Sequence, residues 1–187
     1  MVNQERHEGR EAFSEFMDEF MNESDRACII LACAEMEARF ELLFSKFLKA
    51  NAKLRKDLLS FTGPLGSFSA RVKMAYALGI IAKDFYDLLE LFRPIRNKIV
   101  HKGTAASLAE PDIKELSDKI LEHFRKSKKF KKWAFRIKGF TKDQYQFRHA
   151  LSFIIVMIEH TTKFLDPLNT VPHSCDPEEY ILDDKKA

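Results

Sequence analysis

The chain has 187 residues, 45% of them hydrophobic, with 17 Phe and a net charge of +3. This composition indicates a single globular domain large enough to bury a core, and the net charge points to no particular class of partner. Only 6 Gly and 6 Pro favour an all-α protein over a β-rich one. The longest apolar run, residues 150–158, is too short to cross a bilayer. Because no secretory signal is visible either, we expect a cytoplasmic protein without membrane contact.

The three cysteines, Cys28, Cys33 and Cys175, are odd in number and lack the paired spacing of a zinc site. They fit a reducing compartment. We therefore expect no metal and no cofactor.

Residues 1–23 are predicted to form an acidic, amphipathic helical arm. Residues 1–25 contain eight acidic residues and two arginines. Within residues 8–22, apolar side chains recur at helical spacing and form one stripe: Phe13, Phe16, Met17, Phe20 and Met21. This apolar stripe either docks on the core or binds a partner.

The next segment, residues 25–50 after an N-capping Ser24, is apolar nearly all round and should be the central helix. Glu37 and Glu41 fall on its apolar side, so they need cations or hydrogen-bond donors. We expect a structural ion-pair network with these carboxylates, and a paired-carboxylate catalytic or metal site is the alternative. The members of the expected ion-pair network are Glu37, Glu41, Arg71 and Arg93, with Arg96 as a further candidate cation.

A short helix over residues 53–60 leads into a loop rich in turn residues, 61–69. Ser67 or Ser69 then caps a helix over residues 70–79, which Gly79 ends. The backbone N–H groups at the start of that helix could hold an anion. The loop is not a phosphate-binding P-loop, because no Gly-Lys-Ser/Thr follows it.

Residues 84–103 are predicted to form a helix with one buried face, kinked near Pro94. It carries an Arg-Asn-x-x-x-His signature made of Arg96, Asn97 and His101. Asn97 and His101 share a helix face, and a guanidinium beside an imidazole suits a phosphate. Alternatively, His101 only neutralises the helix C-terminus and Arg96 pairs with a carboxylate.

An amphipathic helix begins at Pro111 and runs through Phe124, and residues 125–138 follow it with eight basic residues and no acidic one. Basic residues interleaved with aromatics can clamp phosphates and stack bases. The alternative is a solvated surface whose aromatics lie on the core. The candidate contacts to a polyanion are Lys126, Lys128, Lys129, Lys131, Lys132, Trp133, Arg136 and Lys138.

The last predicted helix, residues 142–165, has an apolar centre that should be core. Residues 166–187 are predicted to be a flexible acidic tail. With the N-terminal arm, this divides the chain into an arm over 1–23, a helical domain over 24–165 and a tail over 166–187.

Three stretches in fixed order resemble the mannitol operon repressor family: SDRACIILACAEMEARFELLF, LLSFTGPLGSFSARVKMAYALGII and YDLLELFRPIRNKIVH. The resemblance covers roughly residues 24–103. It implies a compact all-helical transcriptional regulator of repressor type without a helix-turn-helix. Such a protein would act through a protein partner.

The signature Arg96-Asn97-x-x-x-His101 is also similar to the HEPN motif. This resemblance implies a single bundle of about six to seven helices with a HEPN-like core, often dimeric. In a HEPN-type metal-independent endoribonuclease, Arg96 would stabilise the phosphorane, His101 would be the acid or base, and Asn97 would orient the site.

We therefore expect a non-enzymatic regulator that binds a protein partner. A homodimer is a further expectation. The alternatives are a HEPN-type ribonuclease using Arg96 and His101, and RNA or DNA binding through residues 125–138. The ribonuclease predicts that Arg96 and His101 converge in a cleft at a twofold interface, where the signature helices of two copies meet. Nucleic-acid binding predicts a steep dependence on salt.

Overall fold

The computed structural model describes residues 18, 20–101, 107–126, 130 and 142–168, and no β-strand occurs among them. The expected all-α fold is confirmed. Six helices have bounds within this part of the chain, and all six begin within two residues of the predicted positions. They are α2 (Asp25–Phe47), α3 (Ala52–Leu59), α4 (Phe68–Ala77), α5 (Lys83–His101), α6 (Pro111–Arg125) and α8 (Lys142–Phe164).

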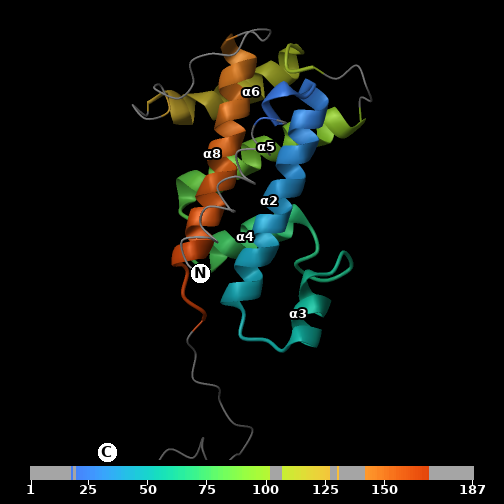
Figure 1. The fold of residues 1–187 in the computed structure, drawn as a ribbon, viewed down its shortest axis with the longest axis vertical. Helices are drawn as coiled ribbons and strands as arrows, with labels where there is room; N and C mark the ends of the chain where they lie inside the picture. Colours follow the sequence, from blue (N-terminus) through green and yellow to red (C-terminus); the bar gives the residue numbers. More distant parts are fainter. Residues whose placement is uncertain (1–17, 19, 102–106, 127–129, 131–141, 169–187) are drawn as a thin grey trace, which may run out of the picture.

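The two longest helices, α2 and α8, lie side by side and share the most extensive interface (Figure 1). They run in the same direction, so their N-terminal ends meet at one end of the bundle and their C-terminal ends at the other. At the C-terminal end, Lys46 Nζ donates to the carbonyls of Thr162 and Lys163 at 2.9 and 3.0 Å. A lysine at a helix C-terminus satisfies carbonyls that have no intrahelical partner.

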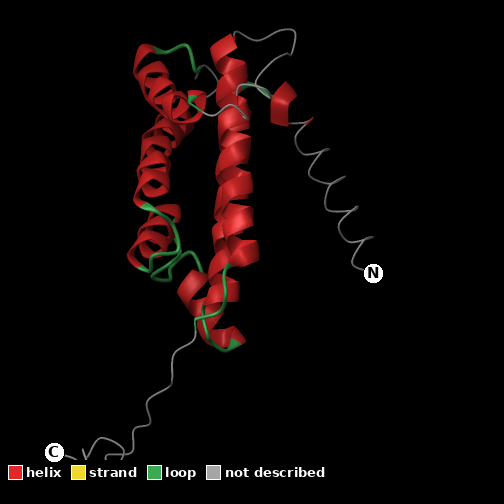
Figure 2. Ribbon diagram, turned by 90° about the vertical axis from the view of Figure 1, so that its left-hand side faces the viewer, coloured by secondary structure: helices red, strands yellow, loops and turns green. Residues whose placement is uncertain are grey.

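The helices α4, α5 and α6 form a second layer against this pair (Figure 2). The buried stripe of α5, with Phe85, Leu89, Phe92 and Ile95 among its members, supplies the contact. An ion pair between Lys98 and Asp112 joins α5 to α6. The α5 helix continues through Pro94, although this residue cannot donate a hydrogen bond to the carbonyl one turn earlier.

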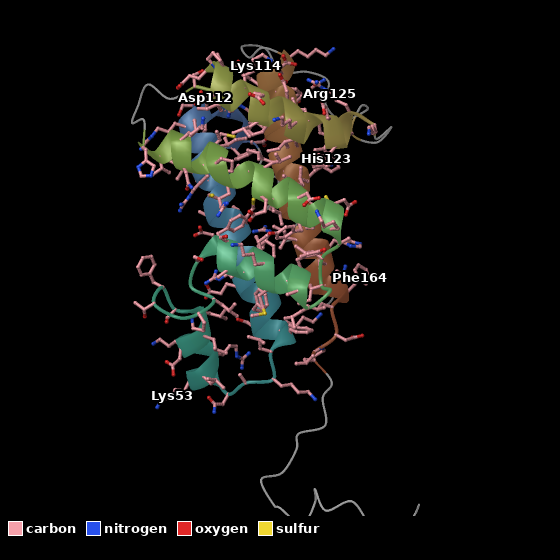
Figure 3. The ribbon with its side chains drawn as sticks, turned by 180° about the vertical axis from the view of Figure 1, so that it is seen from behind. Lys53, Asp112, Lys114, His123, Arg125 and Phe164 are labelled. Carbon is pink, nitrogen blue, oxygen red and sulfur yellow. The ribbon has the colours of Figure 1, made fainter. Side chains whose placement is uncertain are left out.

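The α6 helix is fastened to the start of α8 by two cations, Lys114 and Arg125, which are labelled in Figure 3. Lys114 Nζ and Arg125 Nη2 lie 3.6 and 3.2 Å from the carboxylate of Asp143. These pairs are exposed, so each contributes about 0–1 kcal/mol. The apolar face of α6 supplies the larger share of the contact, because Ile113, Ile120 and Leu121 are fully buried.

Parts of three predicted segments lie outside the described residues. They are the N-terminal arm apart from residues 18 and 20–23, the basic segment apart from Arg125, Lys126 and Phe130, and the tail from residue 169 onward. The division of the chain into arm, domain and tail therefore stays a prediction. Within the described part, Phe20 and Met21 of the predicted apolar stripe are buried in the core.

Candidate functional site

Two adjoining hollows lie along one face of α2, between this helix and the segments from α3 to α5. Their volumes are about 710 and 360 Å³, and they share Glu37, Phe61 and Gly66 in their walls. We call them together the α2 groove. On α2 its lining follows one helical stripe, because successive members are three or four residues apart: Ala34, Glu37 or Ala38, Glu41 and Ser45.

Arg71 holds the walls of the α2 groove together. Its side chain is buried and donates from Nε to the Leu65 carbonyl (2.7 Å), from Nη1 to the Glu37 carbonyl (2.9 Å) and from Nη2 to the Leu59 carbonyl (2.9 Å). One guanidinium on α4 thus satisfies acceptors on α2, on the end of α3 and on the loop between α3 and α4. The planar fork of arginine suits such a multiple role.

The loop over residues 60–67 packs tightly against the end of α3. A Cβ added to Gly63 would lie 2.2 Å from the Asp57 carbonyl oxygen, and one added to Gly66 would lie 2.3 Å from the Ser60 carbonyl oxygen. Glycine is required at both positions because the backbones approach so closely. Ser67 then caps α4, since its Oγ accepts from the Ala70 N–H at 3.1 Å.

Phe61 is presented to solvent by this loop. Its side chain is 95% exposed although it lines both hollows of the α2 groove. An aromatic side chain on a braced loop loses little conformational entropy on binding, and such residues are enriched at the energetic centres of protein interfaces.

The predicted ion-pair residues are distributed as follows. Arg71 Nη2 lies 3.4 Å from Glu41 Oε2, and Arg96 Nη2 lies 3.8 Å from Glu37 Oε1. Arg93 lies instead 3.4 Å from Glu90 on its own helix. Glu37 and Glu41 therefore each face a separate arginine.

The three signature residues do not share one hollow. Arg96 Nη1 is 3.3 Å from Asn97 Oδ1, and both residues line the smaller hollow beside Cys33. His101 is the last residue of α5, is exposed, and is not in the lining of either hollow. Neither of the two hollows therefore brings Arg96 and His101 together.

A buried charged cluster that the sequence analysis missed joins three segments at the other end of α2. The fully buried Arg148 donates from Nη2 to Asp25 Oδ1 at 2.9 Å. Asp25 Oδ2 accepts from Ser107 Oγ, the Leu108 N–H and Gln144 Nε2 at 3.0–3.2 Å. An arginine on the buried side of an otherwise apolar helix was the available signal, because such a charge needs a partner.

Burial favours the protonated form of the two thiols near these sites. Burial raises the pKa of both Cys28 and Cys33 to about 12. The thiolate is the nucleophilic form, so neither side chain suits covalent catalysis near neutral pH.

Of the basic segment, the structure describes Arg125, Lys126 and Phe130. Lys126 is exposed after the end of α6, and Phe130 is buried against Phe124 and Phe153 at ring-centroid distances of 5.3 and 5.6 Å. The other predicted polyanion contacts lie outside the described residues. They are Lys128, Lys129, Lys131, Lys132, Trp133, Arg136 and Lys138.

Among the described residues, no group of three or more His, Cys, Asp or Glu side chains could hold a metal ion. No helix in this part of the chain has the length and apolar character needed to span a membrane.

Comparison with known families matches residues 37–133, just over half of the chain, to the family model "MtlR: Mannitol repressor". The mannitol operon repressor of Escherichia coli strain K12 is 36% identical over 58 residues, which is 31% of this chain and 30% of that protein. The same values apply to the mannitol operon repressor of Escherichia coli O6:H1 strain CFT073. The match therefore spans less than a third of the length of these curated relatives.

A similar solved structure is the X-ray structure of the MtlR-HPr complex from Escherichia coli. The similarity has a TM-score of 0.58 and covers 82% of this chain and 99% of that chain. At 20% sequence identity it shows a shared fold.

Proposed function

This chain belongs to the mannitol repressor family, and from that premise we propose that it is a repressor-type transcriptional regulator that acts by binding a protein partner. The observation that carries the proposal is the family match over residues 37–133. This range contains the lining of the α2 groove from Glu37 to Asn97. The part of the chain that defines the family is thus also the part that builds this surface.

The docking surface in this proposal is the α2 groove with Phe61 at its rim. Support comes from the combination of one exposed aromatic side chain with charged walls, since interfaces typically surround a few anchors with polar groups. Phe61 offers the apolar anchor, and Lys56, Arg93 and Arg96 offer charge. The tight packing at Gly63 and Gly66 keeps the loop in one shape before binding.

The first partner to test is HPr, because the structural neighbour is an MtlR bound to a protein of that name. Calorimetric titration of the full chain with HPr from the organism that encodes this chain should give saturable binding. Phe61→Ala should weaken it at least about tenfold, since truncating an interface anchor commonly costs 2 kcal/mol or more.

Leu42→Ala is the matched control. Leu42 is also a large exposed apolar residue, 63% exposed on α2, but it does not line the α2 groove. Its truncation should leave the affinity unchanged. Equal losses in both variants, or binding that ignores Phe61, would remove the groove as the docking surface. Absence of any binding would remove HPr as the partner.

Three finer points belong to the same proposal. We place the protein in the cytoplasm, where the free Cys28 and Cys33 would stay reduced. A homodimer is to be tested by light scattering. Contact of RNA or DNA with residues 125–138 is to be tested by the dependence of binding on salt, because each phosphate contact releases counterions.

A further inference from the structure

The acidic C-terminal segment, residues 169–187, begins at a fixed point beside the α2 groove. The Leu168 N–H donates to the Phe47 carbonyl at 3.0 Å, so the chain is held to the last residue of α2. Figure 3 shows the labelled Phe164, near the end of α8, in the same half of the molecule as Lys53 on α3. The lining of the larger hollow reaches this end of α2, since it includes Ser45 together with Ala52 and Lys56 of α3.

The segment is long enough to follow the groove. Along α2 the lining extends from Ser45 to Cys33, twelve residues, which is about 18 Å of helix. An extended chain covers about 3.3 Å per residue, so the eight residues from Leu168 to Asp176 reach up to about 26 Å. Residues beyond Asp176 can therefore lie against any part of the groove.

The chemistry of the segment complements that of the groove. Residues 176–184 read DPEEYILDD, in which acidic residues flank Tyr180, Ile181 and Leu182. The two hollows are lined by five cations and only two carboxylates, and Phe61 supplies an exposed aromatic surface. The cations are Arg55, Lys56, Arg71, Arg93 and Arg96.

Two of these cations remain substantially open to solvent despite their ion pairs. The side chains of Arg93 and Arg96 are 47% and 45% exposed, and each lies more than 3.3 Å from its carboxylate partner. Exposed pairs of this kind are weak, so an incoming acidic segment can replace or join them at little cost.

We propose that residues 169–187 occupy the α2 groove of the same chain, with the acidic residues against Lys56, Arg93 and Arg96 and the Tyr180–Leu182 stretch on Phe61. The segment then competes with any protein that docks there. The occupancy is independent of the proposed function, and only the competition rests on it.

Disulfide trapping in the full chain tests the occupancy. Lys56→Cys places a thiol in the lining of the groove, opposite the native Cys175 just before the acidic stretch. Both arms use a Cys33→Ala background, because Cys33 lines the smaller hollow, whereas Cys28 is fully buried and lines neither hollow. Leu42→Cys is the matched control because it lies on α2, five residues before the anchoring Phe47, and outside the groove.

Under mild oxidation without any partner protein, the intrachain disulfide to Cys175 should form about tenfold faster from position 56 than from position 42. A held segment has a raised effective concentration at its docking site. The ratio should fall toward one in about 1 M NaCl, where the Debye length is about 3 Å. It should also fall when Asp176, Glu178, Glu179, Asp183 and Asp184 are replaced by their amides.

Equal rates at the two positions would overturn the proposal, and so would a ratio that ignores the amide replacements. Predominantly interchain disulfides at low protein concentration would assign the segment to a second copy instead, which also contradicts it. Failure of HPr to bind in the calorimetric experiment would leave this result intact, because the trapping uses the chain alone. Circular dichroism melting of each variant verifies that it is folded.

Discussion

Arg148 Nη2 lies 2.9 Å from Asp25 Oδ1, and the Arg148 side chain is fully buried. This pair joins α8 to the first residue of α2. The second carboxylate oxygen accepts from the Leu108 N–H and from Gln144 Nε2, so both oxygens of Asp25 are used. The pair therefore fixes the end of the bundle opposite to the α2 groove.

Asp25→Ala should destabilise the protein by about 3–5 kcal/mol, because it leaves the charge of Arg148 buried without its carboxylate. The free energy of unfolding in urea measures this. Glu115→Ala is the control, since the Glu115–Lys119 pair is exposed and its loss should barely change the stability. Similar losses in the two variants would contradict the structural role of Asp25.

Gly63→Ala and Gly66→Ala should each lower the free energy of unfolding by about 1–3 kcal/mol, since the new Cβ meets backbone oxygens that cannot move aside alone. Because the loop must shift, partner binding through Phe61 should weaken as well. Thr62→Ala, at an exposed position of the same loop, should change neither quantity. Unaltered stability in both glycine variants would show that the loop is looser than described.

His149 should make the protein less stable in mild acid. Burial lowers its pKa, and among the described residues its Nε2 has no hydrogen-bond partner. The unfolded chain binds the proton more tightly, so this contribution to stability is complete above the ordinary histidine pKa of about 6.5. It is lost as the pH falls from there through the lowered pKa of the folded state. His149→Gln should flatten this part of the pH profile of the free energy of unfolding. A slope that persists in the variant would assign it to other groups.

Incubation with structured RNA in EDTA should give the same background cleavage for the wild type, Arg96→Ala and His101→Ala. The physical reason is that Arg96 faces Glu37 while His101 lies at the exposed end of α5. Gel analysis of the fragments, with end-group chemistry, is the measurement. Cleavage by the wild type alone, with 2′,3′-cyclic phosphate ends, would establish the ribonuclease and contradict the regulator proposal.

Local patterns were sufficient for much of the architecture. The starts of α2 and α8 were predicted because Ser24 is a good N-cap and because apolar residues recur throughout both segments. The buried face of α5 was likewise readable from its spacing. The end of α4 near Gly79 follows from the positive φ of 69° at this residue, which glycine adopts without strain.

The sequence predicts less well which side chains pair with one another. The sequence names Arg71 as a candidate partner for the carboxylates of α2, and its Nη2 lies 3.4 Å from Glu41 Oε2, but spacing does not predict its three backbone acceptors. They come from three separate segments, and sequence spacing carries no information on contacts between segments. Arg93, another candidate for that network, lies 3.4 Å from Glu90 on its own helix, where residues three apart are neighbours.

By itself, the sequence determined the helical composition, the positions of the main helices, their buried faces and the resemblance to one family. These depend on short-range periodicity, capping and composition. Only the tertiary structure decided that α2 and α8 run side by side in the same direction, that Asp25 meets Arg148, and that Arg71 closes the α2 groove. These contacts join residues distant in the chain, and their geometry is set by how whole helices pack.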